Sequence, residues 1–102
     1  MSKYKDMDNM ALQLEVAKRL YPDEQEVLLA EMVDSGFMPV YAWEDCYQVL
    51  DALLAITTGI NLKSDGTATT EINGNLASAG GGHCRAICEL YLMAHDAEVN
   101  NG

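Results

Sequence analysis

Apolar and polar residues alternate along the chain with two periods, and the change between them separates a helical part from a sheet part. Up to residue 56 the apolar residues recur every three or four positions, which is the spacing of an amphipathic helix. Between residues 59 and 79, short alternating segments are separated by an Asp-Gly and an Asn-Gly pair. The helical period returns over residues 83–96. The pattern predicts an α+β fold with the order α-α-α-β-β-β-α, in which about four α-helices pack with a small three-stranded antiparallel β-meander.

Three of these helices are predicted before the sheet. The first covers residues 10–20 and follows Asp8 and Asn9, either of which can cap it. The second covers residues 22–36, because a proline suits its first position and a glycine suits its end. The third covers residues 42–56 and has the widest apolar face.

The same spacing predicts which side chains face the core. In the first three helices these are Met10, Leu14, Ala17 and Tyr21, then Val27, Leu28, Ala30 and Met32 or Val33, then Trp43, Cys46, Tyr47, Val49, Leu50, Leu53 and Leu54. In the last helix they are Cys84, Ile87, Cys88, Leu90, Tyr91, Met93 and Ala94 or His95. Helices with such faces are expected to cover the sheet.

The three strands are predicted at about 59–64, 67–72 and 75–79. Asp-Gly and Asn-Gly favour type I′ hairpin turns, since their residues tolerate a positive φ. Alternation then predicts one shared apolar face made of Ile60, Leu62, Ala68, Thr70, Ile72 and Leu76.

Length and cysteine content indicate one domain in a reducing compartment. A chain of 102 residues has room for a single core, and a homodimer contact is a plausible addition. Residues 1–8 and 97–102 are expected to be flexible ends. Three cysteines do not suggest a disulfide framework, and neither a signal peptide nor a membrane-spanning run is evident. We therefore expect a cytoplasmic location.

Charge is the strongest compositional signal. Sixteen acidic residues oppose six basic ones, and the net charge is −10. Eight acids and no base lie between residues 23 and 51: Asp23, Glu24, Glu26, Glu31, Asp34, Glu44, Asp45 and Asp51. Such a surface repels phosphate backbones and attracts basic protein surfaces. With Tyr41 and Trp43 it has the composition of a site for a basic partner, although a purely solubilising face is the open alternative.

The glycine run before the last helix offers a second candidate site. Gly80, Gly81 and Gly82 with His83 and Arg85 resemble an anion-binding helix start. The run lacks the lysine of a phosphate-binding P-loop, and the preceding hairpin is not the parallel unit of a dinucleotide-binding fold. The cysteine and histidine spacing does not match a zinc site or a catalytic Cys-His pair, so we expect no metal, no cofactor and no enzyme activity.

Several short segments resemble small accessory proteins of tailed phages and prophages, of the NinX-like or ABA-sandwich type. The matching residues are Val16, Ala17 and Leu20; Tyr41, Trp43 and Asp45; and Arg85, Ala86, Ile87, Cys88, Leu92, Met93 and Ala94. The resemblance implies a small sheet layered with helices and a phage origin, and it carries over no catalytic residue. The acidic segment 22–36 and the absence of a tryptophan in the hairpin depart from that pattern, so the acidic block inherits no role from the family.

Together these observations predict a non-enzymatic phage protein that inhibits a host defence component, as an anti-CRISPR protein does. Its acidic residues would mimic nucleic acid and occupy a basic, nucleic-acid-binding surface of a host protein, with no direct contact to nucleic acid or membrane. Two alternatives stay open. One is a sponge that sequesters a nucleotide immune signal at the glycine run, and the other is a structural or regulatory phage accessory protein.

Overall fold

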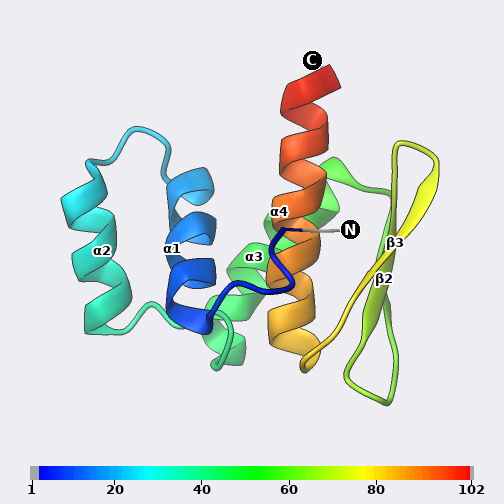
Figure 1. The fold of residues 1–102 in the computed structure, drawn as a ribbon, viewed down its shortest axis with the longest axis horizontal. Coiled ribbons are helices and arrows are strands. Elements are labelled where there is room, and N and C mark those ends of the chain that lie inside the picture. Colours follow the sequence, from blue (N-terminus) through cyan, green and yellow to red (C-terminus); the bar gives the residue numbers. More distant parts are fainter. Residues whose placement is uncertain (1–2, 102) are drawn as a thin grey trace.

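The described part of the chain contains four helices and one three-stranded antiparallel sheet (Figure 1). The computed structural model describes residues 3–101, so the expected flexibility of residues 1, 2 and 102 lies outside the described residues. The elements are α1 (Asn9–Leu20), α2 (Glu26–Ser35), α3 (Trp43–Ile56), β1 (Asn61–Leu62), β2 (Ala68–Ile72), β3 (Asn75–Ala79) and α4 (His83–Asn101). The predicted α+β class and element order are confirmed.

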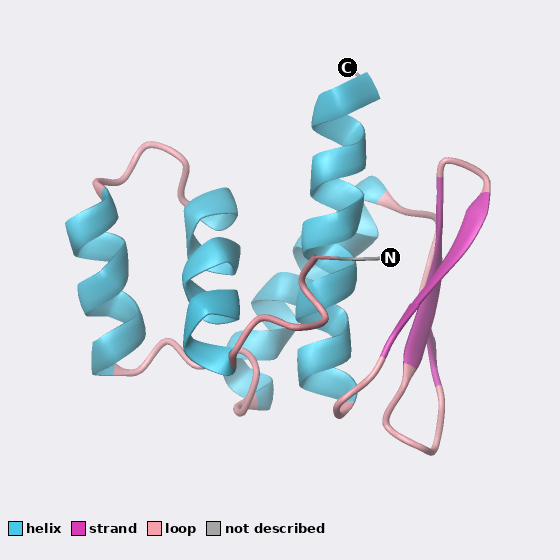
Figure 2. Ribbon diagram, in the orientation of Figure 1, coloured by secondary structure: helices cyan, strands magenta, loops and turns pink. Residues whose placement is uncertain are grey.

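Helix α4 is the centre of the molecule. It packs against α1 and α3 and also against strands β2 and β3 (Figure 1). Figure 2 shows the helices on one side of the molecule and the sheet on the other, with α2 farthest from the strands. Because α4 meets neighbours on most of its circumference, its buried positions form a nearly continuous run, namely Cys84, Ala86, Ile87, Cys88, Leu90, Tyr91, Leu92 and Ala94. The predicted apolar stripe of this helix is thereby confirmed in its main positions.

Helix α1 begins where the sequence predicts but buries a different face. Asp8 is the N-cap, and its carboxylate accepts a hydrogen bond from the Ala11 N–H at 2.8 Å. The buried residues are Leu12, Gln13, Val16 and Ala17, whereas Met10 is exposed. A buried glutamine is tolerated because its amide oxygen accepts from the Val40 N–H at 3.2 Å. Of the predicted stripe, Ala17 is fully buried, while Leu14 and Tyr21 are half-buried and pack against the core.

Helix α2 is shorter than predicted. Pro22 does not start it but follows Tyr21 in a turn closed by a hydrogen bond from Glu24 N–H to the Tyr21 carbonyl, at 3.2 Å. Gly36 ends the helix with a φ of 138°, as expected. Only Leu29 and Val33 of this helix are buried, and Met32 packs against the core while half-buried, because α2 packs on α1 alone among the larger contacts. Val27 and Leu28, which were expected in the core, are exposed.

Helix α3 covers the predicted residues from Trp43 onwards, but its buried face is narrower than the sequence suggested. Cys46, Val49 and Leu53 are fully buried against α4. Trp43, Tyr47 and Leu54 are exposed instead. A helix that contacts neighbours on one side buries a single stripe, so the flanking aromatic residues stay at the surface.

The sheet is a meander in the order β1-β2-β3. The Asn73-Gly74 turn has positive φ angles of 53° and 80°, as a type I′ turn requires. The turn between β1 and β2 differs from the predicted type I′ turn, because it is a longer loop from Lys63 to Thr67. Within this loop the Asp65 carboxylate accepts hydrogen bonds from the Thr67 N–H and hydroxyl. Strand β1 is reduced to two residues.

Leu76 lies on the opposite face of the sheet from the one predicted. The two-residue turn pairs Ile72 with Asn75, which places Leu76 opposite Glu71. Its side chain is 78% exposed. The face that packs on α4 carries alanines in β3, at positions 77 and 79.

Both ends of the chain contain more structure than predicted. Helix α4 continues to Asn101, five residues beyond the expected end at residue 96. Before α1, Tyr4 is buried with 2% of its surface exposed. Contacts of this tyrosine, described below, hold the N-terminal segment against α4.

Candidate protein-binding surfaces

The acidic residues between positions 23 and 51 lie almost entirely at the surface. All eight are exposed except Asp45, which is half-buried. Six of them make no hydrogen bond or ion pair with another described side chain: Asp23, Glu24, Glu31, Asp34, Glu44 and Asp51. Their charges are therefore not neutralised by neighbours within the described part of the chain.

The other two acids of this block have local structural roles. Glu26 forms an ion pair with Lys18 at 3.0 Å, between α2 and α1. Asp45 accepts a hydrogen bond from the Met38 N–H at 2.8 Å and lies in the first turn of α3, where a negative charge is favoured by the helix dipole. Substitution of Asp45 would therefore disturb the loop before α3 as well as the surface charge.

An exposed aromatic group accompanies these acids at the start of α3. The rings of Trp43 and Tyr47 lie 5.4 Å apart, and Trp43 also meets the edge of His83 with 6.4 Å between ring centroids. Trp43 is 41% exposed, and Tyr41 is 61% exposed although its hydroxyl accepts a hydrogen bond from Asn9. Aromatic side chains fixed at a surface are typical of protein interfaces and attract arginine or lysine side chains. Tyr47 was expected in the core, so the aromatic surface is larger than predicted.

The glycine run leads into α4, but its polar residues are engaged within the chain. The Nε2 atom of His83 lies 2.5 Å from the Lys63 carbonyl oxygen. Arg85 donates to the Glu89 carboxylate at 2.9 Å and to the Asn9 amide oxygen. Its Nη2 donates to three carbonyl oxygens of the N-terminal segment, those of Tyr4 at 3.1 Å, Lys5 at 3.3 Å and Met7 at 2.6 Å. The geometry thus gives Arg85 a structural role, which no local pattern in the sequence indicates.

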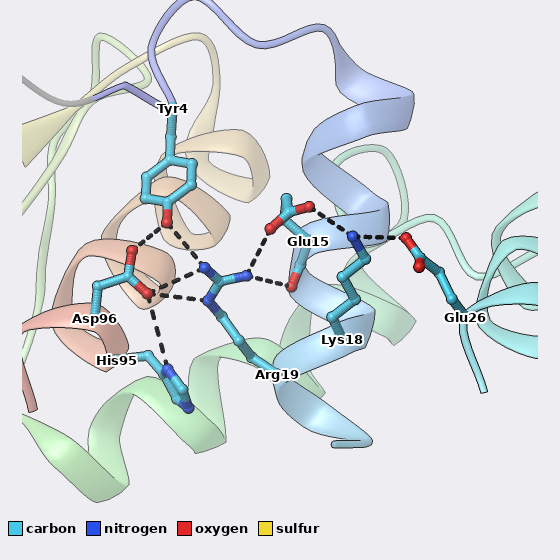
Figure 3. A network of polar contacts seen from close by, with 7 residues as sticks. All are labelled: Tyr4, Glu15, Lys18, Arg19, Glu26, His95 and Asp96. Carbon is cyan, nitrogen blue, oxygen red and sulfur yellow. Dashed lines mark hydrogen bonds and ion pairs between the residues drawn. The ribbon is translucent and has the colours of Figure 1, made fainter. Parts of the chain in front are cut away.

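A second arginine organises a network between the N-terminal segment, α1 and α4 (Figure 3). Arg19 donates to Asp96 at 3.1 Å, to Glu15 at 2.8 Å and to the Tyr4 hydroxyl at 3.0 Å. The Tyr4 hydroxyl in turn donates to the other Asp96 oxygen. Lys18 extends the network from Glu15 to α2. The network joins three helices and the N-terminal segment around one guanidinium.

These contacts shift the protonation of the groups involved. Burial, together with the hydrogen bond to Asp96, raises the pKa of Tyr4 to about 12. Burial alone would raise the pKa values of Glu15 and Asp96, but hydrogen bonds from Arg19 and from Lys18 or Tyr4 outweigh it and lower both. Glu89 differs, because its burial outweighs the hydrogen bond from Arg85 and raises its pKa.

The cysteines belong to the core. Cys46, Cys84 and Cys88 are free and buried where α3 packs on α4. Burial raises the pKa values of Cys46 and Cys88, which keeps both thiols protonated and unreactive. Among residues 3–101, no group of three or more His, Cys, Asp or Glu side chains is arranged to hold a metal ion.

A large surface groove lies between β3, α4 and the N-terminal segment, and no residue of α2 lines it. It has a volume of about 1030 Å³. Its wall contains the consecutive residues 76–81, and Lys3, Tyr4 and Lys5 form the opposite rim. Arg85, Glu89, Met93 and Asp96 line its floor along one side of α4. Sequence reasoning missed this groove, because its walls come from segments more than 70 residues apart.

Comparisons with known proteins add no constraint on the function. No protein-family model matches the chain, and no curated protein or solved structure matches it significantly. The resemblance to phage accessory proteins therefore stays a prediction. Within the described residues, no helix has both the length and the apolar character needed to cross a membrane.

Proposed function

We propose that the protein is a non-enzymatic binding module that inhibits a bacterial defence component by occupying its basic, nucleic-acid-binding surface. The observation that supports this function is the set of six unpaired, exposed carboxylates in the turn before α2, in α2 and in α3, together with the exposed aromatic rings at the start of α3. A phage origin and an anti-CRISPR type of inhibition rest on the sequence resemblance and the charge, and they extend the same proposal.

Carboxylates and aromatic rings suit such a target for separate reasons. Unpaired carboxylates lose no existing partner when they meet lysine or arginine, and their field speeds the encounter at low salt. The rings of Tyr41, Trp43 and Tyr47 supply apolar area and cation–π contacts, which keep the complex together after the encounter. Nucleic acid and the inhibitor would then compete for one surface.

The nucleotide-sponge alternative receives less support from the structure. The guanidinium of Arg85 is bonded to Glu89, Asn9 and three backbone carbonyls, and the His83 ring is bonded to Lys63. Binding a phosphate there would require some of these contacts to break.

A competition experiment tests the proposal. Purified RNA-guided effector complexes are mixed with fluorescently labelled target DNA, and its displacement by the protein is followed by fluorescence polarisation at 50 and 500 mM salt, a range over which electrostatic competition weakens about tenfold or more. The triple variant Glu24→Lys, Glu31→Lys and Glu44→Lys should lose displacement, and Asp45 is left intact because it anchors the loop.

The matched control changes the same total charge elsewhere. Asp6, Glu71 and Glu98 are exposed and lie outside the acidic block. Their triple replacement by lysine should keep displacement within about threefold of the native protein. Equal loss in both variants would indicate a net-charge effect, and displacement that survives in the first variant would refute the acidic surface as the inhibitor.

A further inference from the structure

Strand β3 is an open edge of the sheet. The strand order is β1-β2-β3, so β3 pairs with β2 on one side only. An unpaired edge presents a row of N–H and C=O groups that an extended segment can pair with. The other edge strand, β1, has only two residues and offers a much shorter row.

The register identifies which backbone groups point outward. A two-residue type I′ turn makes Ile72 and Asn75 a hydrogen-bonded pair, and alternation then directs the backbone groups of Ala77 and Ala79 toward β2. The groups of Leu76 and Ser78 consequently point to the free edge. The groove described above runs along this edge, because six consecutive residues from both faces of the strand line it.

The groove has room for one more strand. Figure 1 shows the N-terminal segment crossing in front of α4, and its residues 3–5 line the groove together with residues of β3. The volume of about 1030 Å³ extends between β3 and this segment, over α4. Met93, Ala77 and Ala97 provide an apolar patch toward which every second side chain of a bound strand would point.

The charges around the groove indicate the chemistry of its occupant. Arg85 and Glu89 form an ion pair at 2.9 Å, whereas Asp96 shares the Arg19 guanidinium with Glu15, at 3.1 and 2.8 Å. Lys3 and Lys5 are exposed on the rim and have no ion pair with any described side chain. The groove is thus a locally cationic site in a protein whose net charge is −10. Helix α2 and the turn before it, which carry five of the eight acids of the block, lie beyond α1 as seen from α4 (Figure 1).

We propose that this groove binds an extended, acidic peptide segment of another protein, which adds to β3 as a fourth strand. Backbone bonds to Leu76 and Ser78 hold the segment, apolar side chains pack on α4, and carboxylates meet Lys3 and Lys5. A second copy of this chain suits the groove less well, because β3 carries no carboxylate to offer the lysines of its partner. This site is separate from the acidic surface and does not depend on the function proposed for it.

Binding of defined peptides tests the proposal. The probes are fluorescein-labelled acetyl-(Glu-Val)₃-amide, the corresponding (Lys-Val)₃ peptide, and the acidic peptide with N-methylated alternate residues to remove its edge donors. We expect the acidic peptide to bind at least tenfold more tightly than either of the others. Equal binding of acidic and basic peptides, or no measurable binding of the acidic peptide, would overturn the proposal.

Three variants locate the interaction. Lys5→Glu should weaken binding of the acidic peptide about tenfold, while Lys63→Glu makes the same charge change in the β1–β2 loop and should have little effect. Ser78→Pro removes an outward N–H that no strand inside the molecule uses, so the fold should persist and binding should fall at least tenfold.

Nuclear magnetic resonance keeps the test decisive if Ser78→Pro does not fold. In the native protein, the acidic peptide should shift the amide resonances of Leu76 and Ser78 and leave those of Asn61 and Leu62 unchanged. Shifts confined to the opposite edge would refute the site. A native protein that light scattering shows to be a dimer, and that Ser78→Pro converts to a monomer, would assign the edge to a second copy instead.

Discussion

Replacing Arg85 by methionine should destabilise the protein strongly, because this arginine joins the N-terminal segment to α4. Its side chain is 14% exposed and that of its partner Glu89 is 5% exposed. Removal of one member of a buried ion pair leaves the other charge uncompensated and costs about 3–5 kcal/mol. The carbonyls of residues 4, 5 and 7 also lose their donor, although they regain water if the segment detaches.

The predicted loss is large compared with the stability of a domain of this size. A free energy of unfolding of about 5–15 kcal/mol is typical, so Arg85→Met removes a substantial fraction. With a urea dependence of about 1.5 kcal/mol per molar, the midpoint of unfolding falls by about 2–3 M. Circular dichroism measures this midpoint, and Glu71→Gln, at an exposed position, should change stability by less than about 0.5 kcal/mol.

A double substitution separates the buried charge from general disruption. Arg85→Met with Glu89→Leu removes both charges and should be about 2 kcal/mol more stable than Arg85→Met alone. Trypsin should cleave after Lys5 faster in Arg85→Met than in the native protein, since the segment is no longer held. A loss below about 1 kcal/mol, or no recovery in the double variant, would refute the structural role assigned to Arg85.

Two further predictions concern the ion-pair network and the hairpin. The pKa values of Glu15 and Asp96 are lower in the folded protein than in the unfolded chain, so the unfolded chain binds more protons near pH 4. The stability that these two groups contribute is therefore present above their unfolded-state pKa values and is lost as the pH falls through their folded-state pKa values. Urea midpoints should fall from pH 5 to pH 3, and Asp96→Asn should show a shallower fall; parallel curves would contradict the assignment. Gly74→Ala places a side chain at a φ of 80° and should lower the free energy of unfolding by about 1–2 kcal/mol, whereas Asn75→Ala should lower it by less than about 0.5 kcal/mol. Thermal or urea unfolding measures both, and equal losses of stability would show that the turn is not conformationally restricted.

Much of the fold follows from local rules that the sequence displays directly. The cap at Asp8, the end at Gly36 and the type I′ turn at Asn73 each depend on residues within four positions of one another. The position of Leu76 also follows from such a rule, because a two-residue turn determines the register of its hairpin. The register set by the turn, rather than alternation counted from the first strand, therefore determines which face carries Leu76.

Other features depend on contacts between distant segments and have no local signal. The polarity of Gln13 predicts a surface position, yet its side chain is buried, because the amide oxygen accepts a hydrogen bond from the Val40 N–H. The position of Arg85 at a helix start predicts a free cation, yet it donates hydrogen bonds to backbone carbonyls about 80 residues away in the sequence. The exposure of Val27 and Tyr47 reflects how few neighbours α2 and α3 have, which a single sequence does not reveal.

The placement of the few cations explains why the molecule has two different surfaces. Lys18, Arg19 and Arg85 all form ion pairs, and their acidic partners lie outside the block of residues 23–51 except for Glu26. Apart from the Lys18–Glu26 pair, these three cations stabilise the junction of the N-terminal segment, α1 and α4, and the other acids of α2 and α3 have no cationic partner among them. The negative charges of those acids are consequently not neutralised, while Lys3 and Lys5 give the β3 groove a positive charge. A basic partner and an acidic segment would therefore bind at separate places on one small domain, and blocking either site should leave the other functional.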